Sequence, residues 1–513
     1  MDNSLYDTII VGSGISGMTA GIILAKEGER ALVVEQHSIA GGMTQTYSRK
    51  EKIFPTGVHR LGSLNPGQPL WYYFTYLGLM NKLDLVKLSN ECFERIYFPS
   101  ENYKIPIRHE NYQRTLIESF PDQEKNISTY FFDLKHVISN IGMYDPSIIP
   151  EKDLSLKYTM PLKDYLQSIG ISGRLESLLT ANSPLYGLSS QECPLLTHFL
   201  VSDSYLNSSF RINELDTPFS DTLVDSFKAN GGKIYVNSRV KELIIKNKTV
   251  AGVILDSNER LFSKKVIFSG HPSLILDLSP PELFRPVFRN RLNQANTPGS
   301  FGVALKWAKN TCPLEKNDAY IYDSWDVNYQ YARENIIKDD PLGMVYLSAL
   351  PDKDRPDKAK PDKNRSNISD QNFAVTALTE ISSKESLLLK KYYKESKNDR
   401  YKAAKNKITQ KILNHIKQVY PDIINNIEVV DTYSPATFQR YTLTKNGSSY
   451  GIKKTAQHFL EGMFSPATKI KNLFLTGQSI GFSGIHGSIV SSVNLCQRLF
   501  GKEYLIKKIV QEK

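Results

Sequence analysis

The sequence predicts an α/β protein whose two domains are interleaved along the chain. Three observations lead to this prediction. Near the N-terminus an apolar strand, a glycine-rich turn and a helix pattern follow one another, and the same order recurs near the C-terminus. The length of 513 residues also exceeds what a single hydrophobic core usually serves.

The N-terminal motif is typical of a Rossmann-type dinucleotide-binding unit. An apolar strand leads into Gly12-Ser-Gly14-Ile-Ser-Gly17, a helix pattern follows, and a second strand (31–35) ends on Glu35. Gly12 allows a tight turn, Gly14 lets the backbone approach a pyrophosphate, and Gly17 lets the helix pack closely on the strand. Free N–H groups at the helix N-terminus favour the phosphates, and Glu35 is placed to accept a hydrogen bond from a ribose hydroxyl. We therefore predict that the chain binds a dinucleotide.

The segment after Glu35 indicates which dinucleotide this is. It contains a glycine pair, Gly41-Gly42, just past the ribose-binding strand. Plain nicotinamide-dependent Rossmann enzymes do not need such a pair, whereas flavoproteins use one to bring the backbone close to the extended cofactor. An ordinary loop with two glycines is the alternative. We predict FAD as the cofactor, bound in this part of the chain by Gly12, Ser13, Gly14, Ile15, Ser16, Gly17, Glu35, Gln36, Gly41, Gly42 and Met43.

The composition restricts the remaining classes of protein. Hydrophobic residues make up 40% of the chain, as in a globular protein. The four cysteines lie far apart, without CxxC or metal-ligand spacing, so we expect reduced thiols and no metal site. The chain does not open on a basic segment followed by an apolar stretch, and no window approaches 18 unbroken apolar residues. We therefore expect no membrane-spanning helix and a cytoplasmic location.

The net charge of +11 is unevenly distributed along the chain. Residues 384–418 contain eleven Lys and Arg against three Asp and Glu. Apolar residues recur every three to four positions from Ala404 to Val419, which predicts one amphipathic helix with a basic outer face. A solvated surface, peripheral contact with an anionic membrane at its inner face, and nucleic-acid binding could each explain this face. No zinc-finger, RRM or helix-turn-helix pattern supports the last, so we predict no nucleic-acid partner.

The middle of the chain is predicted to alternate between helical and β-rich sections. In order, these are an aromatic helix (70–79), a hairpin (95–107), a mostly helical section (110–225) with breaks at Gly170, Gly187 and Pro218, and a β-meander (231–272). In two-domain flavoproteins such a meander returns the chain to the cofactor domain, where Val240 would bond the adenine through its backbone.

A second sheet is predicted further along the chain. Residues 300–307, 343–350 and 372–380 have the pattern of strands. Between the last two, a Pro-Asp-Lys repetition cannot bury apolar surface, so we predict a mobile, charged insertion at 351–370.

The C-terminal motif predicts a second anion-stabilising turn. A buried strand (471–478) ends in a turn, and a glycine-dense segment from Gly481 opens a long helix. A small-residue helix packed on a sheet is the alternative. In a flavoprotein this turn faces the pyrimidine edge of the isoalloxazine, where negative charge develops on reduction. The residues predicted to complete the cofactor site here are Gly477, Gln478, Gly484, Ile485 and His486, with Gln478 bonding ribityl or phosphate oxygens.

Together these motifs resemble the phytoene desaturase-related FAD oxidoreductases, and within that family the retinol saturases and the carotenoid isomerases. Their order covers nearly the full length. The most specific matches are the run Val34-Glu-Gln-His37 with its Ala-Gly-Gly and the Leu-Thr-Gly-Gln turn before residue 479. The resemblance also rests on the segments 12–42, 55–62, 434–441, 447–451 and 473–487.

The resemblance implies an amine-oxidase-like flavoprotein that acts on carbon–carbon double bonds of an apolar polyene, by saturation, desaturation or isomerisation. It assigns residues 1–70, 226–275 and 465–513 to an FAD-binding domain, and residues 71–225 and 276–464 to an α+β substrate domain. It places the loop Gly57, Val58 and His59 under the flavin, and Arg440 and Tyr441 in the cavity wall. His59, Arg440 and Tyr441 are the catalytic candidates, with a structural role as the alternative for each.

Two features leave the reaction open. The segment 212–219 replaces a Gly-Gly that such proteins usually have before a helix, which leaves the substrate undetermined. No second GxGxxG with its own acid is present, so electrons must come from transiently bound NAD(P)H, from a quinone, or from a redox-neutral cycle.

Two rival functions share the expected fold. A flavin amine oxidase would need an aromatic cage for a neutral amine. A non-catalytic lipid carrier, in the manner of Rab GDP-dissociation inhibitors, would not need the intact phosphate-binding glycines. The mixed apolar and basic segment 278–289 fits a membrane access patch or a packed loop equally well.

Overall fold

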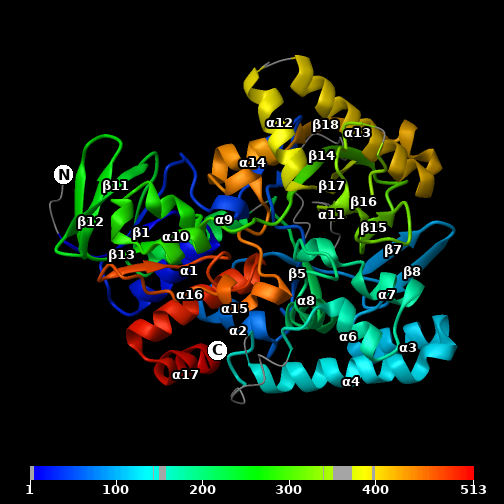
Figure 1. The fold of residues 1–513 in the computed structure, drawn as a ribbon, viewed down its shortest axis with the longest axis horizontal. Helices are drawn as coiled ribbons and strands as arrows, with labels where there is room; N and C mark the ends of the chain where they lie inside the picture. The colour runs from blue at the N-terminus through cyan, green and yellow to red at the C-terminus, as the bar shows by residue number, and fades with distance from the viewer. Residues whose placement is uncertain are drawn as a thin grey trace, which may run out of the picture.

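A computed structural model describes residues 5–142, 144–148, 158–215, 217–338, 340–350, 372–395 and 399–512. Two sheet-containing lobes lie side by side, one around β1 and β13 and the other around β14 to β18 (Figure 1). Helices α3 (His109–Ser119) and α4 (Glu124–Ile141) run along the edge of the second lobe. The α/β fold class predicted from the sequence is confirmed.

The first lobe contains a sheet of seven strands. Its parallel part places β1 between β2 and β13, with Ile10 opposite both Val33 and Ile267. Strand β19 pairs parallel to β13, while β11, β12 and β13 form the expected antiparallel meander. In sheet order the strands are β10 (Lys233–Tyr235), β2 (Ala31–Val34), β1 (Tyr6–Val11), β13 (Arg260–Phe268), β12 (Thr249–Leu255) and β11 (Val240–Lys246), with β19 (Leu473–Leu475) beside β13.

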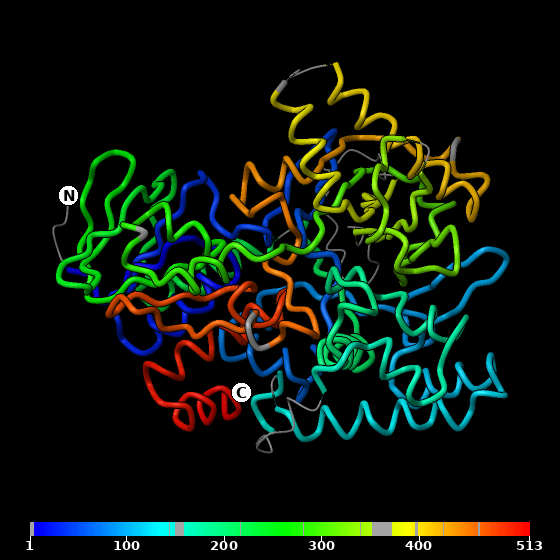
Figure 2. Tube along the Cα trace, in the orientation of Figure 1, coloured from blue at the N-terminus to red at the C-terminus, as the bar shows by residue number. Residues whose placement is uncertain are grey.

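The two ends of the chain meet in this lobe. Helix α1 (Ile15–Lys26) is buried on nearly all sides, because its small and apolar residues pack against α9 (Phe219–Ala229) and α16 (Gly484–Phe500). Figure 2 shows the first and last parts of the trace, in blue and red, lying against each other. Helix α17 (Lys502–Gln511) then packs on α2 (Pro69–Tyr76). The predicted strand–turn–helix order is confirmed at both ends.

The second lobe is built on a mixed sheet of seven strands. Neighbours are antiparallel except β15 and β7, which run parallel. The strands predicted at 300–307, 343–350 and 372–380 are confirmed as β14, β16 and β17. In sheet order they are β18 (Ile427–Tyr433), β14 (Gly299–Ala308), β17 (Asn372–Ile381), β16 (Met344–Ala349), β15 (Asp318–Tyr322), β7 (Glu94–Phe98) and β8 (Glu101–Ile105).

In its described residues the mostly helical section is confirmed, with one strand that the sequence pattern did not reveal. Strand β9 (Ser209–Ile212) pairs with β5 (Leu61–Gly62) and β6 (Leu85–Lys87). Its four residues include a buried Arg211, which hides the apolar pattern of a strand. Besides α3, α4 and α9, the described helices here are α6 (Leu162–Ser168), α7 (Gly173–Thr180) and α8 (Leu195–Asn207). A separate hairpin joins β3 (Thr46–Arg49) to β4 (Lys52–Pro55).

The single basic helix predicted at 384–418 is wrong, because the structure has two. They are α12 (Ser383–Glu395) and α13 (Asp399–Val419). The apolar stripe from Ala404 to Ile416 is buried and belongs to α13 alone, while α12 buries its own Leu389. Asp399 begins α13 with a negative charge, which suits a helix N-terminus. The insertion predicted at 351–370 lies outside the described residues.

Short elements connect these parts. The short α-helices are α10 (Pro286–Leu292), α11 (Tyr329–Ala332), α14 (Pro435–Thr442) and α15 (Phe459–Gly462). The 3₁₀ turns are η1 (Gly42–Thr44), η2 (Pro121–Gln123), η3 (Ser183–Leu185), η4 (Pro272–Leu276), η5 (Pro281–Leu283), η6 (Pro421–Asn425), η7 (Lys445–Gly447) and η8 (Ala456–His458).

In the segment 278–289, Phe284 is buried and stacks on Phe288, whereas Val287 is exposed.

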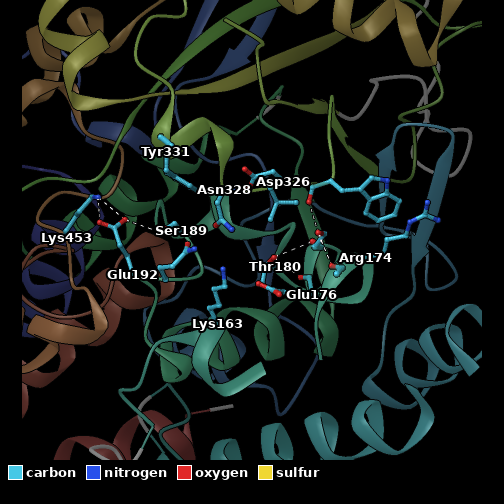
Figure 3. Close-up of a pocket in the computed structure, with 16 residues that line it drawn as sticks. Lys163, Arg174, Glu176, Thr180, Ser189, Glu192, Asp326, Asn328, Tyr331 and Lys453 are labelled. Carbon is cyan, nitrogen blue, oxygen red and sulfur yellow. Dashed lines mark hydrogen bonds and ion pairs between the residues drawn. The ribbon is translucent and has the colours of Figure 1, made fainter. Parts of the chain in front are cut away.

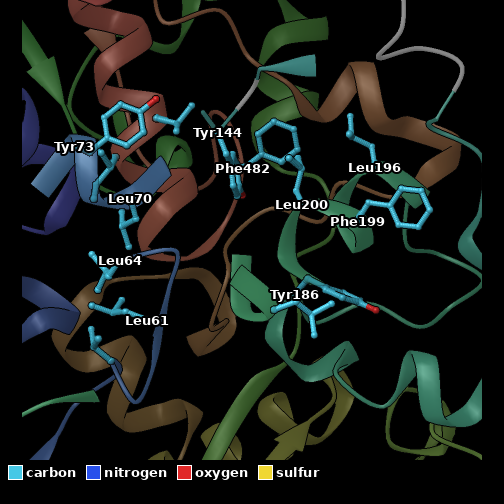
Figure 4. Close-up of a cluster of buried hydrophobic side chains, with 14 of the residues drawn as sticks. Leu61, Leu64, Leu70, Tyr73, Tyr144, Tyr186, Leu196, Phe199, Leu200 and Phe482 are labelled. Atoms are coloured by element: carbon cyan, nitrogen blue, oxygen red, sulfur yellow. The ribbon is translucent and has the colours of Figure 1, made fainter. Parts of the chain in front are cut away.

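The largest hydrophobic core is shared by both lobes. It extends from α1 and α16 through α2 to α4 and α8. Figure 4 shows part of it, where Leu70 and Tyr73 of α2 lie near Tyr144 and Phe482. The Tyr144 and Phe482 rings meet edge to face at 5.5 Å. Among the described helices none is both long and apolar enough to cross a bilayer.

Candidate functional site

One cavity of about 490 Å³ brings the two glycine motifs together. Its lining also includes Ser300, Leu378 and Tyr433 from the sheet of the second lobe, so it lies between the lobes. The predicted site residues that line it are Gly12, Ser13, Gly14, Ile15, Ser16, Glu35, Gln36, Gly42, Met43, Gly57, Val58, His59, Val240, Tyr441, Gly477, Gln478, Gly484, Ile485 and His486. Gly17, Gly41 and Arg440 lie outside the lining.

A larger hollow of about 880 Å³ lies elsewhere, on the second lobe (Figure 3). Most of the residues that line it have polar side chains, and Lys453 pairs with Glu192 across it at 2.7 Å. None of the predicted site residues lines this hollow. The smaller cavity, which has both glycine turns in its wall, is therefore the candidate site.

The N-terminal turn has the close packing that its glycines predict. Gly12 has a φ of +99°, and a Cβ on Gly17 would lie 2.1 Å from the Gly12 carbonyl oxygen. Gly14 differs, because a Cβ there would meet nothing within 4 Å. The turn is thus tightly packed on the side of the sheet and open on the side of the cavity.

Helices α1 and α16 both begin at the cavity wall. The Ser492 hydroxyl donates to the Ser16 carbonyl at 2.8 Å, and the Gly477 N–H donates to the Ser491 hydroxyl at 3.2 Å. Neither helix has a side-chain cap at its N-terminus. The first-turn N–H groups of two helices are therefore available to an anion at one site.

Glu35 is buried beside the first turn. Its Oε2 accepts hydrogen bonds from the Ser13 N–H at 2.9 Å and the Ser13 hydroxyl at 2.5 Å, and its Oε1 accepts from the His37 N–H at 3.0 Å. Because a carboxylate offers about four acceptor positions, Glu35 keeps capacity for a ligand hydroxyl.

The glycine pair after Glu35 serves two purposes. Gly41 has a φ of +121°, and a Cβ on it would lie 2.5 Å from Ser220 Cβ, so it allows α9 to approach. Gly42 lines the cavity, with space for a Cβ limited to 3.0 Å from Gly14 Cα. At Gly57 a Cβ would lie 2.7 Å from Met43 Cε, the end of a flexible side chain that can move aside.

The C-terminal turn is supported by a buried lysine that the sequence pattern did not single out. Lys454 Nζ donates to the Gln478 carbonyl at 2.7 Å, and burial lowers the pKa of this amine to about 7. The Gln478 side-chain amide donates to the Ser449 carbonyl at 3.2 Å. These contacts fix the turn that begins at Gly477.

The three catalytic candidates have different positions. His59 lines the cavity, its Nδ1 has no hydrogen-bond partner within the described chain, and burial lowers its pKa to about 4. Tyr441 lies at the rim with about half of its surface exposed, next to His37. Arg440 is exposed, with its guanidinium 5.7 Å from the Tyr441 ring, and it does not reach the lining. Only His59 is therefore placed inside the cavity.

The sequence did not predict the apolar part of the remaining wall. Its residues come from α2, α8, β17, α14 and neighbouring loops: Leu61, Leu70, Tyr144, Leu185, Val201, Tyr205, Leu378, Phe438 and Tyr450. In the sequence these residues follow the same periodicities as ordinary core residues. Within the described parts of the chain, no group of three or more His, Cys, Asp or Glu could hold a metal ion.

Known proteins of similar sequence are consistent with a dinucleotide-binding site in this cavity. The model of the NAD(P)-binding Rossmann-like domain matches residues 10–77. The all-trans-retinol 13,14-reductase of Danio rerio is 25% identical to this chain, over 98% of this chain and 88% of that protein. The chloroplastic prolycopene isomerase of Arabidopsis thaliana is 20% identical, over 94% of this chain and 82% of that protein.

The chain resembles the phytoene desaturase-related oxidoreductases. Among solved structures, an oxidoreductase from Methanosarcina mazei has a TM-score of 0.65 at 15% identity, covering 96% of this chain and all of that one. A redesigned putrescine oxidase has a TM-score of 0.64 at 14% identity, covering 98% and 99%. These structures share the amine-oxidase-like fold. The chain is an oxidoreductase with a flavin or nucleotide cofactor.

Proposed function

We propose that this protein is an FAD-dependent oxidoreductase that acts on carbon–carbon double bonds of an apolar polyene. The observation that carries the proposal is the single cavity with two unlike sides. Glycine turns and helix N-termini form one side, and apolar side chains form the other. The reductase and isomerase names of the full-length relatives support the same reaction class.

The residues present fit FAD. The turn from Gly12 to Ser16 would hold the pyrophosphate, because Gly14 is open to the cavity and the α1 N-terminus is uncapped. Glu35 would accept a ribose hydroxyl, and Val240 would contact the adenine through its backbone. The isoalloxazine would then lie among Met43, the loop 57–59 and the turn 477–486.

The bound flavin would supply hydride transfer to or from a polyene carbon. The protein itself has three tasks. The apolar wall holds the chain and excludes water, the α16 N-terminus stabilises negative charge, and His59, neutral at pH 7, can orient a group by a hydrogen bond. Saturation, desaturation and isomerisation use this same arrangement and differ in the electron partner, for which NAD(P)H and a quinone are our candidates.

The proposed positions of the cofactor and the substrate also suggest how the chain divides into domains. We assign residues 1–70, 226–275 and 465–513 to the FAD-binding domain and residues 71–225 and 276–464 to the substrate domain. All strands of the first sheet come from the former set of segments, which supports the assignment.

Anaerobic mixing of the flavin-loaded protein with candidate polyenes tests the function. We expect the reduced flavin to be oxidised by a substrate, or the oxidised flavin to be bleached by one, with a product mass that changes by two hydrogens. An unchanged mass with altered double-bond geometry would identify isomerisation. A protein that purifies without flavin under gentle conditions, or one that forms peroxide from amines, would contradict the proposal.

Peripheral contact with an anionic membrane is the second part of the proposal. Helix α12 packs on α14, whose Phe438 and Tyr441 line the cavity, and it exposes Leu387 and several lysines. Such a surface suits the extraction of a lipid substrate. Vesicles that contain phosphatidylserine should retain the protein at low salt, and K384E with K394E should abolish retention. Equal retention by neutral vesicles would contradict this part.

A further inference from the structure

A buried glutamate lies on a strand that forms part of the cavity wall. Leu378 of β17 lines the cavity, and Glu380 follows two positions later, so the two side chains are on the same face of the sheet. The register partner of Glu380 in β14 is Ser300, which also lines the cavity. Glu380 does not belong to the lining, and 5% of its surface is exposed. Its carboxyl therefore lies beside the wall of the cavity.

The Glu380 carboxyl is not paired with a cation in the described structure. The Arg333 guanidinium acts on it, but that group binds Glu385 at 2.8 and 3.1 Å. Its other hydrogen bonds go to the backbone carbonyls of Leu342 and Glu380. Glu380 Oε2 is buried and has no hydrogen-bond partner within the described residues. Burial raises the pKa of Glu380 to about 8, and the Arg333 charge opposes this less strongly, so the carboxyl is protonated at pH 7.

Three tyrosines from separate elements face this carboxyl. They are Tyr322 of β15, Tyr331 of α11 and Tyr450, which follows η7. Burial raises the pKa of each phenol, and a charge on Glu380 raises it further. Together with Arg333, they are the titratable groups that face Glu380 from other elements of the described structure.

Two of these tyrosines connect Glu380 to different spaces. Tyr450 lines the cavity, whereas Tyr331 lines the polar hollow of the second lobe (Figure 3). The wall of that hollow includes the exposed residues Gln191 and Asp326, so the hollow is open to solvent. Glu380 therefore lies between the cavity and a source of protons.

The two histidines that the proposed site places beside the isoalloxazine are poor proton donors. His59 and His486 both line the cavity, and burial lowers their pKa values to about 4 and about 3. Both rings are therefore neutral at pH 7. Because saturation of a double bond needs a proton as well as a hydride, a different acid is required.

We propose that Glu380 is the proton reservoir of the reaction and that the Tyr450 phenol, which lines the cavity, passes the proton to the polyene. The inference rests on the proposed function and adds to it the residues that supply the second hydrogen of a saturated product. Glu380 acts through Tyr450, directly or through a water molecule, and takes up its next proton from the side of the hollow.

The proposed step balances in hydrogen and in electrons. In saturation, one carbon accepts a hydride from the reduced flavin, and its neighbour accepts the proton of the Tyr450 hydroxyl, so that one π bond is replaced by two C–H bonds. The proton of the Glu380 carboxyl restores the phenol, and the resulting carboxylate takes a proton from water. Both electrons arrive with the hydride. In desaturation each transfer runs in reverse, and the Glu380 carboxylate receives the proton.

Infrared difference spectroscopy on the unchanged, flavin-loaded protein tests the reservoir without relying on turnover. We expect a protonated carboxyl band that disappears as the pH rises through about 8, that shifts in D₂O, and that E380Q removes. T379V is the matched control, because Thr379 lies on the opposite face of β17 and its hydroxyl is buried without a partner in the described structure. It should leave the band unchanged.

Anaerobic mixing tests the transfer to the polyene, with all-trans-retinol and a carotene as the first two compounds tried. The single-turnover rate of saturation should fall above about pH 8, and that of desaturation should rise there. E380Q should remove this inflection and lower the rate of saturation at pH 7 by about 100-fold or more, with the polyene affinity unchanged within about threefold. Y450F should lower the rate while the infrared band stays, and T379V should change neither.

Each failure has a distinct result. The absence of a band that titrates near pH 8, a wild-type rate in E380Q or Y450F, or an inflection that survives in E380Q overturns the inference and leaves the polyene function intact. Circular dichroism and flavin content report whether E380Q is folded; if it is not, Y450F decides, because it keeps the carboxyl. If no polyene reacts with the flavin of the unchanged protein, the proposed function fails, and the role of Glu380 fails with it.

Discussion

The two sides of the cavity are formed by different parts of the residues, backbone on one side and side chains on the other. On the side of the first sheet, the contacts are those of backbone held by glycines, where one added carbon at Gly17 would lie 2.1 Å from a carbonyl oxygen. On the other side, side chains from α2, α8, β17 and α14 form the wall. The first side tolerates almost no change in shape, whereas the second can change residue by residue. In the proposed function, cofactor binding and substrate choice would thus depend on different sides of the cavity.

The largest expected effect comes from a substitution that adds volume to the closely packed glycine turn. G17A should destabilise the protein by about 3 kcal/mol or more and abolish cofactor retention, because the added methyl overlaps the Gly12 carbonyl and Ser269 Oγ. Thermal unfolding and the flavin-to-protein absorbance ratio measure both effects. A G17A protein with wild-type stability would show that the turn is not closely packed.

Acid should destabilise the protein through two buried histidines. Burial lowers the pKa of His486, in the cavity wall, and of His198, in α8, to about 3. Both stay neutral in the folded state, while the unfolded chain takes up protons below about pH 6.5. The stability that these residues contribute is therefore complete above pH 6.5 and is lost as the pH falls towards 3.

Urea unfolding between pH 7.5 and 4.5 measures this loss, which we expect to reach a few kcal/mol in sum. H198Q removes one titrating group and should flatten the pH dependence, although it also lowers the stability at neutral pH by disturbing the contacts with Tyr130 and Tyr186. An equally steep dependence in H198Q would be inconsistent with a buried neutral imidazole.

A second substitution in the same turn, G14A, serves as the counterpart of G17A because it should affect cofactor binding without affecting folding. G14A adds a methyl where nothing lies within 4 Å, at a φ of −59° that any residue adopts. We expect unchanged thermal stability of the apoprotein and an FAD affinity reduced by about tenfold or more, because the methyl occupies the space for the pyrophosphate. Isothermal titration with FAD decides; unchanged affinity would place the phosphates elsewhere.

The adaptable side should give the smallest effect on stability. V201A removes two methyl groups from a partly buried side chain that lines the cavity, so we expect a loss of about 1 kcal/mol. The variant should bind a bulkier polyene relatively better than wild type does, measured by competition between two polyenes of different width. A loss several times larger would mean that Val201 packs as core.

The sequence reveals the rigid side well because its function depends on backbone shape. Gly12, Gly17 and Gly477 can be read in order along the chain, and their positive φ or close contacts leave glycine as the residue that fits. The side chains of the other wall come from distant segments and follow core periodicity, so Val201 and Leu378 cannot be told from core residues.

Charged residues of the second lobe account for the remaining differences between prediction and structure. Arg211 hides strand β9, since its ion pair with Asp318 lies 107 positions away in sequence. The split between α12 and α13 is missed because basic residues continue through it while the apolar stripe serves α13 alone. Arg440 is predicted in the cavity wall by resemblance, yet α14 turns it outward, whereas its neighbour Tyr441 reaches the rim.

The hydrogen bond from Ser492 to Ser16 joins residues 476 positions apart. During synthesis, the ribosome has released almost the entire polypeptide before this bond can form. For most of the time that translation takes, helix α1 therefore lacks α16, the helix that completes its burial. The wall of the cavity that both helices line, and with it the proposed FAD site, is therefore completed late in folding.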